Sequence, residues 1–220
     1  MKTNYWQTFY ENAYYHIYNR TNGHDYLFAN EGNYRYFLER WHIYFGNYLD
    51  TYAYCLMSNH FHCIVRVKPV DEAFKTAVAI ETTVAARLFL QNKISLNTFL
   101  EDQFKRFFTS YAKSFNKQHD RHGSLLEKRF KRVQITEHLI LLDKIAYVHH
   151  NPLHHNLSPF YEVWTYSSYL IYLSNKQTKL KRSEGLHLFD GQNGSVPVFE
   201  KYHQDFHRRW LNDQITDDFE

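Results

Sequence analysis

Cysteine, proline and glycine are all scarce in this chain of 220 residues, which contains 2, 4 and 7 of them. Cys55 and Cys63 lack the paired spacing of a zinc finger or a disulfide framework, so we expect two reduced core residues. No apolar run approaches the length that crosses a membrane, and the N-terminus lacks a basic region followed by an apolar stretch. These absences exclude a disulfide scaffold and predict a cytoplasmic protein without a membrane partner.

Aromatic residues are abundant instead, with 19 Tyr, 18 Phe and 4 Trp. A core of this size needs fewer rings, so some should lie on the surface, where rings beside cations can stack on unpaired bases. Tyrosine-rich segments also arise because aromatic residues favour strands. The net charge is only +3, but cations concentrate at residues 128–132 and 176–182. These two runs either neutralise phosphates or form ordinary solvated surface.

The order of the periodic segments predicts an α+β protein. Strand-forming residues dominate 14–18, 51–57, 61–67 and 123–135, and apolar residues recur at helical spacing in 30–48, 71–89, 100–118, 136–151 and 196–210. This order fits a ferredoxin-like split β-α-β fold, with an antiparallel sheet and helices on one face. We expect residues 1–170 to form one domain and residues 171–220 to be a C-terminal extension packed on it.

His60 and His62 are the sharpest local feature of the sequence. Residues two apart on a strand project from the same face, so both imidazoles can reach one metal ion. A chain with 15 His can also contain such a pair by chance. A second cluster ends the helix expected over 136–151, where Tyr147 and Asn151 are four residues apart and share a face.

Together the two clusters predict a metal site beside a nucleophile. Two imidazoles and the Asn151 amide oxygen would leave positions open on a divalent ion such as Mg²⁺ or Mn²⁺, which could polarise a phosphate oxygen. The Tyr147 phenol could then attack the phosphorus, because its anion is a competent nucleophile. Taken separately, Tyr147 would be a core aromatic and Asn151 would end a helix before Pro152.

Other residues offer alternatives. Tyr111 is a rival nucleophile near Lys113, but Asn116 is five residues on and faces away, so we expect Tyr111 to be in the core or to contact DNA. A run of histidines could build a separate metal site or contact phosphate, and the absence of an acidic or cysteine partner favours phosphate. These histidines are His149, His150, His154 and His155.

These motifs, in this order, resemble a known family. Residues 54–65, which carry His60 and His62, look like the HUH motif of the one-tyrosine transposases, and residues 147–152 look like that family's nucleophile helix. Residues 16–20 and 27–28 resemble its first strand and following turn, and residues 123–132 and 164–169 resemble the branch of REP-associated tyrosine transposases and IS200-like relatives. The resemblance covers roughly residues 13–170, and the ordered combination is more specific than each piece.

The resemblance implies an HUH endonuclease fold with His60, His62 and Asn151 as ligands of Mg²⁺ or Mn²⁺ and Tyr147 as the nucleophile. Asn151 departs from the glutamine that some relatives use. The implied activity is cleavage of single-stranded, hairpin-containing DNA through a 5′-phosphotyrosine intermediate, followed by strand transfer in DNA transposition and recombination.

The remaining expectations concern partners. Cations at Arg20, Lys128, Arg129, Lys131 and Arg132 would bind DNA, a homodimer is possible, and the protein would be cytoplasmic and nucleoid-associated. One alternative is a domesticated, non-catalytic DNA-binding repressor of the same fold, and another is a metal-dependent phosphodiesterase that uses activated water.

Overall fold

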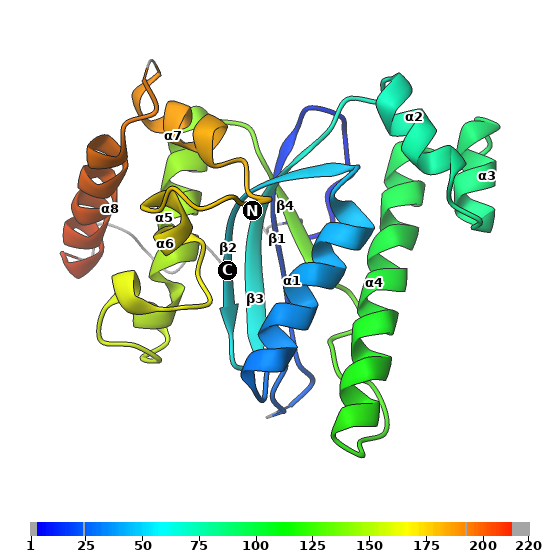
Figure 1. Ribbon diagram of the computed structural model, residues 1–220, viewed down its shortest axis with the longest axis horizontal. Coiled ribbons are helices and arrows are strands. Elements are labelled where there is room, and N and C mark those ends of the chain that lie inside the picture. Colours follow the sequence, from blue (N-terminus) through cyan, green and yellow to red (C-terminus); the bar gives the residue numbers. More distant parts are fainter. Residues whose placement is uncertain (1–3, 24, 192, 213–220) are drawn as a thin grey trace.

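A four-stranded antiparallel sheet forms the centre of the computed structural model, which describes residues 4–23, 25–191 and 193–212 (Figure 1). Its strands are β1 (Tyr14–Arg20), β2 (Leu49–Met57), β3 (His60–Val67) and β4 (Lys131–Ile135), in the spatial order β2-β3-β1-β4. This order, in which β2 and β4 flank a central β1–β3 pair, is the ferredoxin-like arrangement. The predicted α+β, ferredoxin-like class is therefore confirmed.

Helices cover both faces of the sheet, whereas the sequence led us to expect them on one. On one face lie α1 (Glu31–Phe45) and α4 (Leu96–Gln118), and on the other lies α5 (His138–His154) (Figure 1). The physical reason is that β3 is apolar on both sides: Phe61 packs toward α1 and α4, and Ile64 packs toward α5. A sheet with two apolar faces needs two covering layers.

The C-terminal elements extend the α5 layer. After η1 (Tyr161–Val163) and α6 (Tyr169–Tyr172), α7 (Arg182–Asp190) and α8 (Val196–Leu211) complete the layer, and Leu186 and Phe199 join its core. Helix α8 thus packs on α5, and α7 packs on α8. The boundary at residue 170 stays a prediction, and residues 213–220 lie outside the described part. No helix in the described ranges is both long and apolar enough to span a membrane.

Some boundaries differ from those expected. The expected helix 71–89 is two helices, α2 (Glu72–Ala79) and α3 (Val84–Leu90), because Asp71 and Thr83 each cap a new N-terminus. The expected strand 123–135 is regular only from Lys131. The helix expected over 136–151 is α5, which begins at His138 after the N-cap Glu137 and continues past Pro152 to His154.

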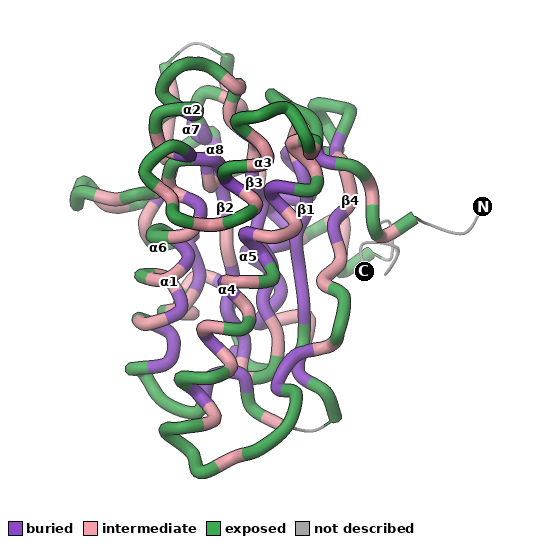
Figure 2. Tube along the Cα trace, turned by 90° about the vertical axis from the view of Figure 1, so that its right-hand side faces the viewer, coloured by how far each residue is buried: buried purple, intermediate pink, exposed green. Residues whose placement is uncertain are grey.

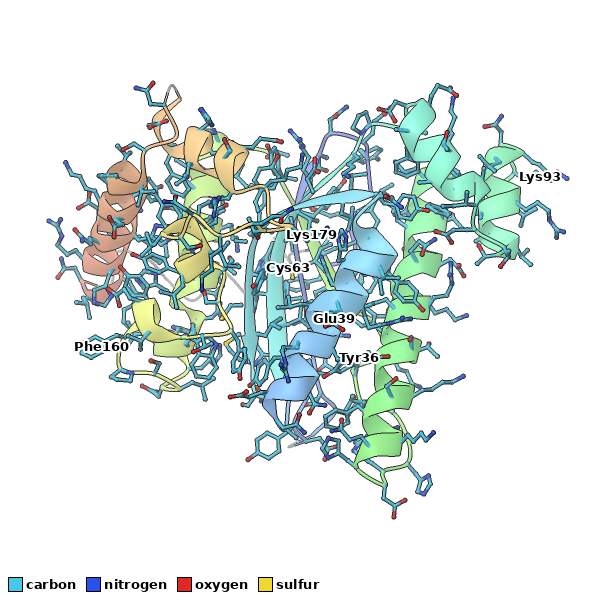
Figure 3. The ribbon with its side chains drawn as sticks, in the orientation of Figure 1. Tyr36, Glu39, Cys63, Lys93, Phe160 and Lys179 are labelled. Carbon is cyan, nitrogen blue, oxygen red and sulfur yellow. The ribbon has the colours of Figure 1, made fainter. Side chains whose placement is uncertain are left out.

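The two cysteines are reduced and buried, as expected. They lie on neighbouring strands but belong to different layers, because Cys55 packs with α5 and Cys63 packs with α1 and α4. Figure 3 shows Cys63 inside the sheet, and Figure 2 shows that β1, its neighbour, is buried along most of its length.

A buried chain of hydrogen bonds connects α8 to the sheet. His203 donates from Nδ1 to the Phe199 carbonyl and accepts at Nε2 from His149 Nδ1, each at 2.8 Å. The other nitrogen of His149, Nε2, lies 2.8 Å from the Ser168 hydroxyl, which accepts from the Tyr54 amide at 2.9 Å. Burial lowers the pKa of His203 to about 3, so this chain is built from neutral imidazoles.

We expect this chain to make the fold sensitive to acid. In the unfolded protein His203 takes up a proton near its ordinary pKa of about 6.5, but in the folded protein only near pH 3, so stability falls as pH falls between these values. The contribution of His203 is about 1.4 kcal/mol per pH unit. Urea unfolding at pH 7 and at about pH 5 should therefore show a smaller loss of stability in His203→Gln than in the wild type; equal losses would contradict the prediction.

Candidate active site

The pairing of β1 with β3 gathers three rings on the α5 side of the sheet. Tyr18 lies directly opposite His62, and His16 is two residues away on the same strand face. The His16 and Tyr18 rings stack with centroids 4.7 Å apart, and Tyr18 stacks on His62 at 5.2 Å. A continuous stack of two imidazoles and a phenol therefore covers this part of the sheet.

A hydrogen bond between the imidazoles sets which nitrogen of His62 is available. His16 Nε2 and His62 Nδ1 are 2.8 Å apart, so one must donate and the other accept. Burial lowers the pKa of both rings well below the usual value, with nearby charges adding to the effect, so both rings are neutral. If His62 Nδ1 donates, its Nε2 keeps a lone pair, and this tautomer suits metal binding.

Helix α5 brings Tyr147 to the same imidazoles. The Tyr147 ring meets His62 edge-on at a centroid distance of 6.0 Å and meets His16 in the same way at 6.2 Å. Lys144, one turn earlier on α5, places its ammonium 5.6 Å from the Tyr147 ring centroid. Tyr147 is 6% exposed. The structure therefore places the Tyr147 ring beside His62, one of the two predicted imidazole ligands, and beside His16.

Asn151 lies one turn beyond Tyr147 and is buried. Its side-chain amide donates to the Tyr147 carbonyl at 2.8 Å, which fixes the direction of the amide group. Its oxygen, Oδ1, is buried and has no hydrogen-bond partner among the described residues, and the same holds for His62 Nε2. Buried acceptors without donors are costly, and a cation is one group that would satisfy both.

The donor set fits a divalent cation held by few protein ligands. No group of three or more His, Cys, Asp or Glu side chains in the described ranges could hold a metal, so a site here depends on the amide of Asn151 in addition to imidazoles. The amide oxygen suits Mn²⁺ or Mg²⁺ and the imidazoles suit transition-metal ions, and a divalent ion with so few protein ligands keeps positions for phosphate oxygens and water.

A polar pocket of about 330 Å³ opens in front of His60 and His62. His60 lies at its wall with its Nδ1 2.6 Å from Asn59 Oδ1, and its ring meets that of His155 at 4.6 Å. The pocket's other lining residues come from the ends of β1, β3 and β4 and the segment after α5: Tyr18, Asn19, Arg20, Ser58, Asn59, Glu127, Lys131, His155 and Leu157.

The residues predicted to bind DNA separate into three groups. Arg20 and Lys131 line the pocket of His60 and His62, where Arg20 forms a 2.6 Å ion pair with Glu127. Lys128 and Arg129 line a second pocket beside α4. Arg132 also lines that second pocket, but it is buried, ion-paired with Glu101 and donates to the Gln7 carbonyl.

Other expectations are also decided by burial. Tyr111 donates to the Leu27 carbonyl at 2.7 Å within the α1–α4 layer, on the far side of the sheet from His62, so it is a core residue. His149 is fully buried in the chain that contains His203, and His150 is buried against Tyr161. The C-terminal helices cover both histidines. They are therefore not exposed to phosphate, contrary to the expectation from the sequence.

Sequence reasoning missed three residues of this site. His16 and Tyr18 belong to the alternating strand 14–18, and the period of two could have placed them on one face. Lys144 is three residues before Tyr147, so helical spacing could have placed it on the same face. What the sequence could not show was that β1 lies beside β3, which brings His16 against His62.

No family model matches the chain. A curated Haemophilus influenzae protein, provisionally named a REP-associated tyrosine transposase, is 23% identical to it over 122 residues. The match covers 54% of this chain and 58% of that protein, so the chain spans somewhat more than half of its relative's length.

A solved structure gives an independent comparison. The structure of a REP-associated tyrosine transposase bound to a REP hairpin superposes with a TM-score of 0.52, 12% identity, and coverage of 80% of this chain and 87% of that one. The chain therefore shares the fold of that transposase structure. Over 122 residues its sequence is similar to that of the curated REP-associated tyrosine transposase.

Proposed function

We propose that this protein is a metal-dependent, single-strand DNA nickase and strand transferase that uses Tyr147 as its nucleophile. The observation that carries the proposal is the position of the Tyr147 ring, edge-on to His62 at 6.0 Å. Packing alone does not explain why Tyr147 lies beside two neutral imidazoles, His62 and His16, and next to Asn151, whose buried amide oxygen has no hydrogen-bond partner among the described residues. The sequence relationship to a transposase supports the same assignment.

His60, His62 and Asn151 would hold the metal ion. A divalent cation bound there would supply Lewis-acid polarisation of the scissile phosphate. His16 would orient His62 through the bond between Nε2 and Nδ1. Hydrogen bonding to the Tyr147 carbonyl orients the amide of Asn151, and both Asn151 Oδ1 and His62 Nε2 are buried without a hydrogen-bond partner among the described residues.

The reaction of Tyr147 conserves the energy of the phosphodiester. Its phenolic oxygen loses a proton and bonds to phosphorus as the bond from phosphorus to the 3′-oxygen breaks, and the leaving oxygen takes up a proton to become a free 3′-hydroxyl. The product is a 5′-phosphotyrosine. Attack by the 3′-hydroxyl of a second strand reverses these steps and releases Tyr147, so no nucleotide cofactor is needed.

The substrate is proposed to be single-stranded DNA that carries a hairpin. The related solved structure contains a REP hairpin, and Arg20 and Lys131 at the mouth of the pocket are cations that could contact phosphates. Assembly as a homodimer and association with the nucleoid stay predictions.

End-labelled DNA tests the proposal directly. With Mn²⁺ and a single-stranded hairpin substrate, the wild-type protein should form an adduct that survives denaturation and carries a 3′-end label, while a 5′-end label leaves with the free 3′-hydroxyl fragment. Cleavage without an adduct would instead indicate a phosphodiesterase that activates water. Binding without cleavage would indicate the non-catalytic repressor.

We expect His16→Phe to weaken metal binding while leaving the fold intact. The substitution keeps a ring of similar size but removes the partner of His62 Nδ1, so Mn²⁺ affinity should fall about 10- to 100-fold. Titration of Mn²⁺ followed by electron paramagnetic resonance measures this without DNA. The matched control is His122→Phe, which alters an exposed histidine, and the same affinity in both variants would argue against an orienting role for His16.

A further inference from the structure

A second pocket lies against α4, on the other side of Glu127 from the imidazoles. It has a volume of about 600 Å³ and lies between α4 and residues 123–130. We name it the α4 groove. Glu127 lines both the α4 groove and the pocket of His60 and His62, so the two spaces are neighbours along the surface.

The α4 groove carries an excess of cations. Lys105 and Lys113 contribute from α4, and Lys128 and Arg129 contribute from the opposite wall; all four are exposed, and none forms an ion pair with another described residue. The two acids of the lining, Glu101 and Glu127, are already paired with Arg132 and Arg20. The net charge offered to a ligand is therefore positive, which favours a polyanion.

The α4 groove also presents an exposed aromatic face. Trp6 is 42% exposed, and the Arg129 guanidinium lies 5.0 Å from its ring centroid. The backbone holds Trp6 in place, because the amide of Arg132 donates to the neighbouring Tyr5 carbonyl at 2.7 Å. Phe108 adds a half-buried ring to the lining. An indole fixed by the backbone can stack on the bases of an unpaired strand, and neighbouring cations without ion-pair partners among the described residues can bind its phosphates.

We propose that the α4 groove binds unpaired nucleotides of the DNA strand next to the cleavage point, with Trp6 as the stacking platform and Lys105 and Lys113 on the phosphates. The occupant is single-stranded rather than duplex, because stacked base pairs do not expose the faces of their bases to an indole. This proposal rests on the proposed function for the identity of the strand, and it assigns that strand a second contact outside the pocket of His60 and His62.

Fluorescence anisotropy with a labelled, short oligodeoxythymidylate tests the proposal in EDTA, where no metal-dependent cleavage occurs. Replacing Trp6 with Ala should weaken binding about tenfold, within the range found when a stacking ring is removed. The control Tyr10→Ala removes an exposed ring from the same N-terminal segment, outside the α4 groove, and should leave binding unchanged.

The salt dependence of binding separates the phosphate contacts from stacking. In the double variant Lys105→Gln, Lys113→Gln, the slope of log affinity against log salt should be shallower by about 1.4, because each lost phosphate contact on a single strand changes it by about 0.7. Lys93→Gln, which changes a cation beyond the end of α3 (Figure 3), should keep the wild-type slope.

Two outcomes would overturn the proposal: unchanged affinity in Trp6→Ala, or equal binding of the oligonucleotide and of a duplex of the same sequence. Both outcomes are measured by binding in EDTA, where Tyr147 does not cleave the DNA. A protein that binds the oligonucleotide through Trp6 but forms no adduct with Mn²⁺ would retain the α4 groove as a DNA site while disproving the nickase. If Trp6→Ala forms the adduct and binds the oligonucleotide as well as the wild type does, the nickase proposal stands and the α4 groove is disproved as a DNA site.

Discussion

Tyr147→Phe is expected to abolish the protein–DNA adduct and to lower strand cleavage by at least about a thousandfold, the order seen when an enzyme loses its nucleophile. The substitution removes only the phenolic oxygen. The ring keeps its edge-on contacts with His62 and His16, so the metal ligands and the core should be unchanged. Denaturing gels of labelled hairpin DNA incubated with Mn²⁺ measure both products, and anisotropy in EDTA should show unchanged DNA binding.

Two other tyrosines make this test specific. Tyr111→Phe removes a phenolic hydroxyl from the opposite layer and should retain adduct formation, because the Tyr111 hydroxyl donates to the Leu27 carbonyl in the core, on the far side of the sheet from His62. Tyr18 is the second phenol beside His62, at a centroid distance of 5.2 Å. An adduct that persists in Tyr147→Phe and disappears in Tyr18→Phe would transfer the role of nucleophile to β1 and overturn our assignment.

His62→Ala is expected to have the second-largest effect, a loss of cleavage of at least about a hundredfold, because it removes a proposed metal ligand rather than a group that orients one. The loss should be partly reversed by raising the Mn²⁺ concentration, since the remaining donors would still bind the ion weakly. Tyr147→Phe should show no such rescue at any concentration. Initial cleavage rates measured across a Mn²⁺ series distinguish the two behaviours.

Destabilisation is the competing explanation for an inactive His62→Ala, since His62 is fully buried in the sheet layer. Circular dichroism melting of the variant therefore accompanies the kinetic measurement. Asn151→Gln offers a second variant, because it keeps the amide oxygen proposed to bind the metal and lengthens the side chain by one methylene group. If His62→Ala is folded and cleaves at the wild-type rate, the metal site does not include this imidazole.

Several elements could be predicted from local pattern. The His-x-His spacing placed His60 and His62 on one strand, and the alternating and helical periods located most strands and helices to within a few residues. Local signals were weaker where two helices shared one apolar run, as at Thr83. They were also weaker at residues 123–130, which alternate but join the sheet only through an isolated bridge between Thr21 and Leu126. Hydrogen bonding to a neighbour, rather than composition, decides whether such a segment is a strand.

Long-range packing changed the roles of some residues that pattern alone had grouped. Lys128, Arg129, Lys131 and Arg132 form one basic run, yet Arg132 turns inward to Glu101 while Lys131 faces the imidazole pocket. Adjacent residues on a strand project to opposite sides, so one run supplies two environments. His149 was likewise withdrawn from solvent, because α8 packs over it and supplies His203.

The sequence by itself determined which chemical groups this protein has and how they are spaced within each element: two imidazoles two residues apart on a strand, and a phenol and an amide four apart on a helix. Spacing within one element follows from backbone geometry, which needs no knowledge of the rest of the chain. Only the tertiary structure decided that α5 packs on β2 and β3, that β1 places His16 against His62, and that the C-terminal helices bury His149. These contacts join residues far apart in the chain, and they depend on which apolar faces pack together, a property of the whole fold.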